Sequence, residues 1–182
     1  MNRKTRCAYV AAAAATAAGM LMLGVTSPVS AATGDTSATV TITGGALQIS
    51  VPVSAGSLGS RANTITGGTI SGTLGVVQVV DARSAVAGSG WVASVISTAF
   101  TPTTGSTIGA ANVSYTAGAI TKTGTAVYIA NDPVGLTAAS AAVTATGITG
   151  DNSATWSPMI HVAVAGGTIA GTYAAVITHS VV

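Results

Sequence analysis

Short runs in which apolar and polar residues alternate dominate the chain from about residue 38 onward. Each run is rich in Val, Ile and Thr and is bounded by Gly, Pro, Asn or Asp, a pattern typical of half-buried strands between turns. The predicted strands are residues 38–43, 46–51, 69–83, 91–98, 111–116, 126–130, 136–146, 159–165 and 173–182. About nine short strands with evenly spaced turns predict an all-β fold, an antiparallel β-sandwich of the Ig-like or a related Greek-key kind.

The last run, "YAAVITHSVV", carries a regular stripe of large side chains along one face. Successive side chains of a strand point to opposite faces, so Tyr173, Ile177, His179 and Val181 share one face. Because this face is bulkier than the other, we expect the C-terminal strand to lie in the core and to close a sheet. His179 is expected to be a core or rim histidine whose ring bonds to a backbone carbonyl.

The first run, "ATVTIT", places Thr39, Thr41 and Thr43 on one face. Flat ice-binding surfaces use such a pattern, but here it occurs once and does not repeat at a fixed period. An edge strand in which threonine suits the pleated surface is the simpler interpretation.

Composition favours strands over helices. The chain contains no Glu, and beyond residue 32 its basic side chains are Arg61, Arg83 and Lys122. Helices usually carry long charged side chains on their solvent side, whereas Thr and Val suit a sheet. Against the four aspartates, these three residues leave a net charge of −1, so we expect no basic surface for nucleic acid or anionic lipid.

The first 32 residues resemble a secretory signal peptide. Arg3, Lys4 and Arg6 precede a long alanine-rich apolar run, and small residues up to Ala32 offer a cleavage site. A membrane anchor is the alternative, but the run is short of strongly apolar side chains. We therefore expect residues 1–32 to be removed and residues 33–182 to form one secreted, extracellular or cell-wall-associated domain. That domain has no Cys, because Cys7 lies in the leader, so it must be stable without disulfides.

Candidate catalytic residues are few. Asp81, Asp132 and Asp151 lie in turns or at strand ends, whereas glycosidases need two carboxylates held a fixed distance apart. His161 and His179 have no GxSxG serine beside them in the sequence and no third ligand at a spacing that suits zinc. We therefore expect a protein that is not an enzyme and that uses no cofactor and no metal.

Binding residues are easier to nominate. Asp81 and Arg83 share a strand face and can pair, either as a structural ion pair or as part of a site. Trp91 and Trp156 each lie where a strand is expected to open after a glycine or turn region, directly at or just before the predicted strands 91–98 and 159–165. There an indole ring can stack on a sugar or plug the end of the core. If the domain binds sugar, Trp91 with Asp81 and Arg83 is the first candidate patch and Trp156 is the second.

The segment "VVDARSAVAGSGWVA" resembles the first motif of the WxL-domain surface proteins of Gram-positive bacteria, and of their secreted actinobacterial relatives in particular. The family pattern is a VxDxR strand that continues through a Gly-rich turn into a WxL sequence. Here Val79, Asp81, Arg83 and Trp91 match this pattern, and Ala93 replaces the leucine.

A second motif of that family, YxxxIxWxL, lies near the end of its chains. The matching positions here are Tyr173, Ile177, His179 and Val181, with histidine in place of tryptophan and valine in place of leucine. The resemblance covers about residues 46–182. It implies non-covalent attachment to the cell wall, to peptidoglycan in particular, and association with other surface proteins.

These observations predict a secreted, non-catalytic β-sandwich module that associates with the cell envelope and binds peptidoglycan or another cell-wall glycan. The alternative is a structural subunit of a surface layer or filament, joined to its copies or to other surface proteins through edge strands. Low charge and a mean hydropathy of +0.64 suit a protein that covers its surface against others.

Overall fold

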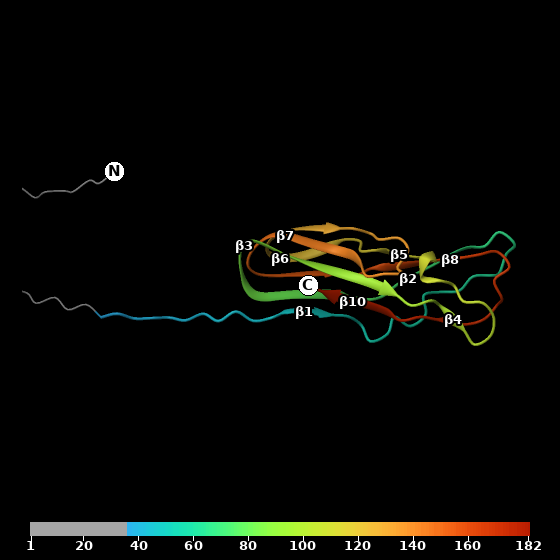
Figure 1. The fold of residues 1–182 in the computed structure, drawn as a ribbon, viewed down its shortest axis with the longest axis horizontal. Coiled ribbons are helices and arrows are strands. Elements are labelled where there is room, and N and C mark those ends of the chain that lie inside the picture. The colour runs from blue at the N-terminus through green and yellow to red at the C-terminus, as the bar shows by residue number, and fades with distance from the viewer. Residues whose placement is uncertain (1–35) are drawn as a thin grey trace, which may run out of the picture. The chain divides into compact units, whose positions relative to one another are not determined.

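The computed structural model describes residues 36–182, so the predicted leader lies outside the described residues. Within these residues, ten strands and one short 3₁₀ helix follow one another, and the prediction of an all-β, antiparallel fold is confirmed (Figure 1). Among the described residues, no helix is long and apolar enough to cross a membrane. The elements are β1 (Leu47–Ser50), β2 (Gly68–Thr73), β3 (Val77–Ser97), β4 (Thr101–Pro102), η1 (Ala110–Asn112), β5 (Val113–Thr116), β6 (Ile120–Ala130), β7 (Ser140–Trp156), β8 (Met159–Val164), β9 (Tyr173–Ala174) and β10 (Ile177–Val181).

The larger sheet has the strand order β1-β3-β7-β6, and β10 pairs with β3 as well. Two short strands therefore share one edge of β3: β1 pairs with its first part, where Leu47 faces Asp81, and β10 pairs with its last part, where Ile177 faces Ser97. The long antiparallel pair of β3 and β7 forms the centre of this sheet.

The smaller sheet has the order β2-β8-β5, and β4 and β9 form a separate two-stranded pair. Side chains from both larger sheets belong to one hydrophobic cluster, so the sheets share a single core. The larger apolar side chains that are buried include Val77, Val79, Val95, Val143, Ile148 and Trp156 from β3 and β7, and Val113, Tyr115 and Ile160 from β5 and β8.

The sequence prediction placed a turn before residue 91, but β3 runs without interruption from Val77 to Ser97. The register with β7 shifts several times between Asp81 and Trp91, where Ser84 and Gly88 have positive φ values of 53° and 89°. At Gly88 such an angle causes no strain, because glycine has no Cβ atom. The register shifts are β-bulges, which let the strand bend and continue. The Gly-rich segment is therefore a bend within one strand, visible at one end of the molecule in Figure 1.

The strand predicted at residues 38–43 is wrong for the described chain. Residues 36–46 are in no strand, and Val40 and Ile42 are 87% and 86% exposed. Residues 38–43 have the alternation of a strand, but no strand within residues 36–182 pairs with them. Their backbone N–H and C=O groups and their apolar side chains therefore face solvent.

The C-terminal segment has the predicted alternation but is less buried than expected. Tyr173, Ile177, His179 and Val181 are half-buried on one side, whereas the side chains between them are exposed. The segment forms two strands, of which β9 pairs with β4 and β10 with β3. Since β10 pairs with a single neighbour, it lies at the edge of the sheet and packs against the core rather than within it.

Residues 51–64, called the strap below, connect β1 to β2 without joining a sheet. All strap side chains are exposed except Leu58, which is half-buried against the core. The strap passes so close to β2 that a Cβ atom on Gly72 would lie 2.6 Å from the Cα atom of Leu58. Nearby, the guanidinium of Arg61 occupies the space that a side chain on Gly68 would need. Glycines in β2 therefore allow the strap to approach.

Replacing Gly72 by Ala should displace the strap, because the new Cβ would overlap the backbone of Leu58. We expect Gly72→Ala to lower the free energy of unfolding by about 1–3 kcal/mol, as measured by urea denaturation. Gly109→Ala is the matched control, since its backbone has a negative φ of −65° and its surroundings are open. A Gly72→Ala variant as stable as the control would contradict the close approach.

Candidate functional site

Asp81 and Arg83, predicted to pair, do form an ion pair on β3. The Nε and Nη2 atoms of Arg83 lie 2.8 and 2.9 Å from the two carboxylate oxygens of Asp81, and the amide N–H of Arg83 donates to Oδ1 at 3.1 Å. Asp81 has no exposed surface, whereas the Arg83 side chain is 38% exposed. The hydrogen bond from the Arg83 side chain holds the pKa of Asp81 below its usual value, against the opposing effect of burial.

Asn152, directly opposite Asp81 on β7, joins this pair to two aromatic residues. Its Nδ2 atom donates to Asp81 at 3.2 Å, and its Oδ1 atom accepts from Nε1 of Trp91 at 3.1 Å and from the hydroxyl of Tyr128 at 3.0 Å. The amide thus has a partner on each side, and the network connects β3, β6 and β7. Sequence reasoning missed Asn152, because "GDNSA" is typical of a turn and the cross-strand partner of Asp81 depends on the register.

Trp91 belongs to this network, but its ring is only 2% exposed. The ring of Tyr128 lies 5.7 Å from it, and Nζ of Lys122 lies 5.8 Å from the centre of the Tyr128 ring. The structure therefore brings together Asp81, Arg83 and Trp91 as predicted. The Trp91 indole has no free face on which a sugar could stack. Of the two roles expected for this ring, the structure therefore favours packing in the core.

Trp156 ends β7 rather than opening a strand as expected, and it lies in a separate buried network on the same face of the larger sheet. Its Nε1 atom donates to the hydroxyl of Tyr115 at 2.7 Å, and Nε2 of His179 lies 3.3 Å from the same hydroxyl. Trp156 is also 2% exposed. Burial raises the pKa of Tyr115 and lowers the pKa of His179, so both groups are held neutral near pH 7. The partner of His179 is thus a tyrosine hydroxyl, not the backbone carbonyl that was expected.

His161 lies on the outer side of the smaller sheet. Its Nδ1 atom is 2.8 Å from the hydroxyl of Ser71, and its Nε2 atom is 3.3 Å from the hydroxyl of Thr116. None of these three residues lines a described cavity. Within residues 36–182, no three His, Cys, Asp or Glu side chains come together as potential metal ligands.

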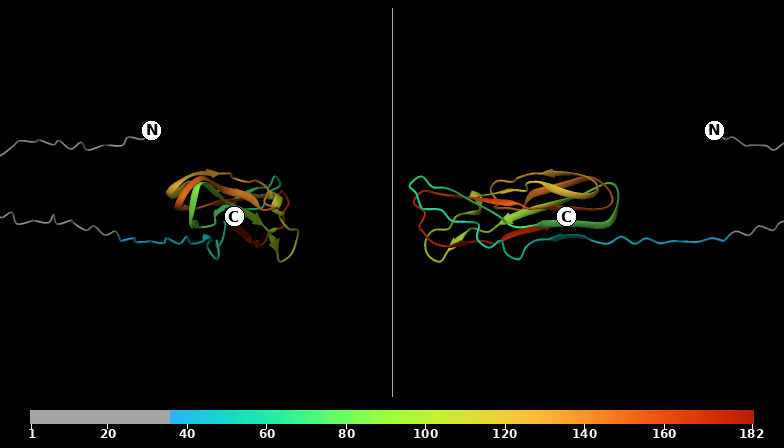
Figure 2. Two further views of the ribbon diagram at one scale, coloured as in Figure 1. Left: turned by 60° about the vertical axis from the view of Figure 1, so that its left-hand side comes forward. Right: turned by 180° about the vertical axis from the view of Figure 1, so that it is seen from behind.

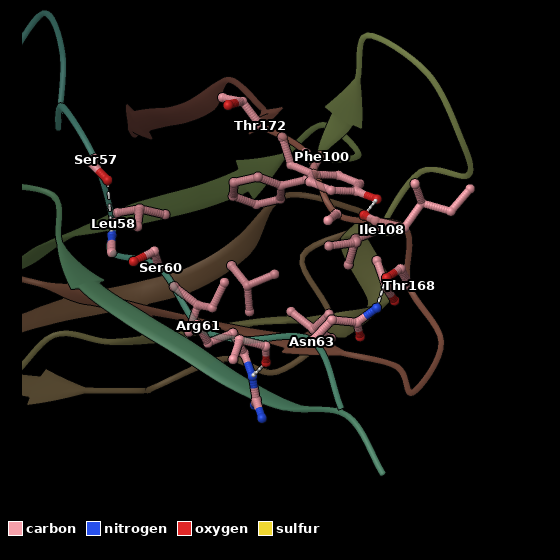
Figure 3. Close-up of a pocket in the computed structure, with 18 of the residues that line it drawn as sticks. Ser57, Leu58, Ser60, Arg61, Asn63, Phe100, Ile108, Thr168 and Thr172 are labelled. Atoms are coloured by element: carbon pink, nitrogen blue, oxygen red, sulfur yellow. Dashed lines mark hydrogen bonds between the residues drawn. The ribbon is translucent and has the colours of Figure 1, made fainter. Parts of the chain in front are cut away.

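A cavity of about 600 Å³ lies elsewhere, between the strap and residues 168–174. Its lining includes Phe100, directly before β4, and both residues of β9. The right panel of Figure 2 shows the loops before β2 and after β8 at the end of the folded domain opposite the bend of β3. Figure 3 shows the strap on one side of the cavity and Phe100 with Ile108 on the other. Its apolar lining consists mainly of Leu58, Ile70, Phe100, Ile108, Val162 and Val164.

Polar groups complete the walls of this cavity. The amide of Asn63 donates to the carbonyl of Thr168 at 2.6 Å, which joins the strap to the facing loop. The ring of Tyr173 lines the cavity, and its hydroxyl donates to the carbonyl of Ile169 at 2.7 Å. Further hydroxyl groups come from Ser57, Ser60, Thr64 and Thr172.

Of the sequence-predicted residues, Tyr173 is the one that lines this cavity. The strap residues were not nominated, because a polar Ser- and Gly-rich segment between two strands is typical of any connecting loop. The cluster of Ser57, Ser60, Arg61 and Asn63 within a few positions was the available signal.

Comparison with known proteins identifies no relative: no family model, no curated protein and no solved structure matches the chain.

Asn152→Ala should remove the shared partner of three groups, the buried Trp91 indole, the buried Asp81 carboxylate and the half-buried Tyr128 hydroxyl. We expect the free energy of unfolding to fall by about 2–4 kcal/mol in urea denaturation, because buried polar groups lose their partners. Asn131→Ala is the control: its exposed amide makes one bond, to Thr144, and the loss should be at most about 1 kcal/mol. Equal losses in the two variants would contradict a central role for Asn152.

Acid should weaken the fold through Asp81. Because the folded-state pKa of Asp81 is lowered, its ionised form stabilises the fold above about pH 3.8, and this stabilisation is lost as the pH falls below that value. We expect Asp81→Asn to be less stable than wild type near neutral pH and to lose less stability on acidification. Urea denaturation between about pH 6 and pH 2 measures both effects. Parallel stability curves for the two proteins would exclude Asp81 as the source of acid sensitivity.

Proposed function

We propose that residues 33–182 form a secreted, non-catalytic module of the cell envelope that binds a cell-wall glycan in the cavity beside Tyr173. The observation that carries this proposal is the cavity itself. Its volume of about 600 Å³ lies in the range of small-molecule sites, and it combines an apolar floor with separate polar groups. Sugars present both kinds of surface, because their C–H faces are apolar and their hydroxyl groups donate and accept hydrogen bonds.

Tyr173 is the proposed stacking residue. Its hydroxyl is already bonded to Ile169, so the ring is held in place while part of it remains exposed. A pre-positioned aromatic ring contributes to sugar binding with little loss of side-chain freedom. This assignment transfers the sugar contact from Trp91 and Trp156, whose rings are buried, to the cavity.

The chemistry of the lining supports binding rather than hydrolysis. The residues that line the cavity include no Asp, Glu, His or Cys. Glycoside hydrolysis ordinarily requires two carboxylates, one of which donates a proton to the leaving oxygen. A ligand in this cavity would therefore meet hydroxyl, amide and backbone groups and the side chain of Arg61, which can orient a sugar but supply no general acid or base.

The envelope location rests on the sequence. The basic and apolar leader favours export, and the two WxL-like motifs favour attachment to the cell wall. Within the fold, Asp81, Arg83 and Trp91 of the first motif form the buried network, and Tyr173 of the second motif lines the cavity. We propose that the first motif maintains the fold and that the second contributes to the binding surface.

Sedimentation of the protein with purified cell walls tests this proposal. We expect the wild-type protein to sediment with the walls and Tyr173→Ala to bind about tenfold more weakly, because the stacking ring is lost. Tyr173→Phe is the matched control, since it loses the same hydroxyl bond but keeps the ring, and it should bind nearly as well as wild type. Failure of the wild-type protein to sediment, or equal recovery of wild type and Tyr173→Ala, would overturn the proposal.

A further inference from the structure

We propose that residues 38–43, called the arm below, add as an extra strand to the free edge of β6 in a second copy of the chain. The arm has the alternation of a strand, yet it pairs with nothing within residues 36–182. Val40 and Ile42 are 87% and 86% exposed, an unusual state for two β-branched apolar residues in one short segment. Pairing with a sheet edge would satisfy its backbone and cover both side chains.

The acceptor is the second half of β6. This strand pairs with β7 alone, so the hydrogen-bonding groups along its other edge have no strand partner among the described residues. From Val127 to Ala130 the register with β7 is regular and contains no charge, proline or bulge, the features that usually protect an edge. Val127 and Ile129 are 59% and 51% exposed there, which provides apolar neighbours for Val40 and Ile42.

Other free edges are less suitable. The outer edge of β5 is occupied by the loop that follows β6, since Tyr115 donates to the carbonyl of Pro133 and Gly135 donates to that of Val113. The strap lies against β2 at Gly72 and crowds that strand. β1 and β10 have four and five residues, whereas β6 has eleven, and its regular part from Val127 to Ala130 would pair with four residues of the arm.

The order of strands makes the partner a second copy. Immediately after the arm, Gly44 and Gly45 lie against Arg83 and Ala82 of β3, on the side of β3 where β1 pairs. β6 lies at the opposite edge of the same sheet, beyond both β3 and β7. Three strand spacings separate the two edges, roughly 14 Å, so residues next to Gly44 cannot run along the β6 edge of their own chain.

This pairing joins two different surfaces, the arm of one copy and the β6 edge of the next. Such a head-to-tail contact leaves one free arm and one free edge in a dimer that is joined once, so further copies can add and form chains or rings. Charge does not oppose it, since the arm is uncharged and Lys122 is the one charged side chain on β6. The contact between the arm and β6 involves neither the cavity nor Tyr173, so it is independent of the proposed sugar binding.

Cross-linking between two variants tests the contact. The full 182-residue sequence is expressed for export in a Cys7→Ser background, so that no native cysteine remains. One preparation carries Val40→Cys and the other Val127→Cys, and the two are mixed under mild oxidation. We expect disulfide-linked pairs with one chain of each kind. Val53→Cys replaces Val40→Cys in the control, since Val53 is also a fully exposed valine but lies outside the arm, and it should yield few such pairs.

Sedimentation velocity supplies the second measurement. We expect the wild-type protein to form species larger than a dimer as its concentration rises, and Val40→Lys and Ile129→Lys to raise the dissociation constant about tenfold or more. Val53→Lys should leave association unchanged. A wild-type protein that stays monomeric, association that survives both variants, or equal cross-linking at positions 40 and 53 would overturn the inference. At protein concentrations too low for association, cell-wall sedimentation of the same variants should remain as in wild type.

Discussion

The buried carboxylate of Asp81 is the constraint on which the rest of the larger sheet depends. A charged group without exposed surface is costly unless other groups neutralise it and satisfy its hydrogen bonds. Arg83 provides the charge and Asn152 provides a further bond from the opposite strand. A shift of one residue between β3 and β7 would turn Asn152 to the other face and remove this bond. The polar network therefore specifies the register of two long strands that bulges would otherwise allow to slip.

The domain has few charged residues and many small ones, so it can form few ion pairs. Buried aromatic side chains and close backbone packing contribute to its stability instead. Large buried side chains, such as Trp156 and Tyr115, combine apolar area with a hydrogen bond between their polar ends. Backbones approach closely where glycines permit, as between Gly72 and Leu58, and this approach holds the strap against the core. The same packing shapes the cavity, because the strap forms one of its walls. Fold stability and the proposed binding site therefore share the same segment.

Sugar binding and self-association would use different parts of the molecule. The cavity is formed by loops near β4 and β9, whereas the proposed association uses the arm and the edge of β6. One chain could therefore hold a glycan while its arm is paired with a neighbour. Chains of weak binding modules would attach to a polymeric wall more strongly than single modules, because each bound module raises the effective concentration of the next.

The sequence by itself determined the fold class, most strands and the inward faces, because the period of two and the turn residues are local properties. Half-buried Tyr173, Ile177, His179 and Val181 show that alternation alone identified the correct side of the last strand. Tertiary structure decided how far each strand continues and what pairs with it. Residues 38–43 alternate as well as any strand, yet no neighbour is placed beside them, and β3 continues through glycines that resemble a turn. It also decided the sites: Asn152 reaches Asp81 only through the β3–β7 register, and the cavity is made by segments far apart in sequence. Periodicity shows which face of a segment is apolar, but burial and pairing depend on contacts between distant residues, which no local pattern contains.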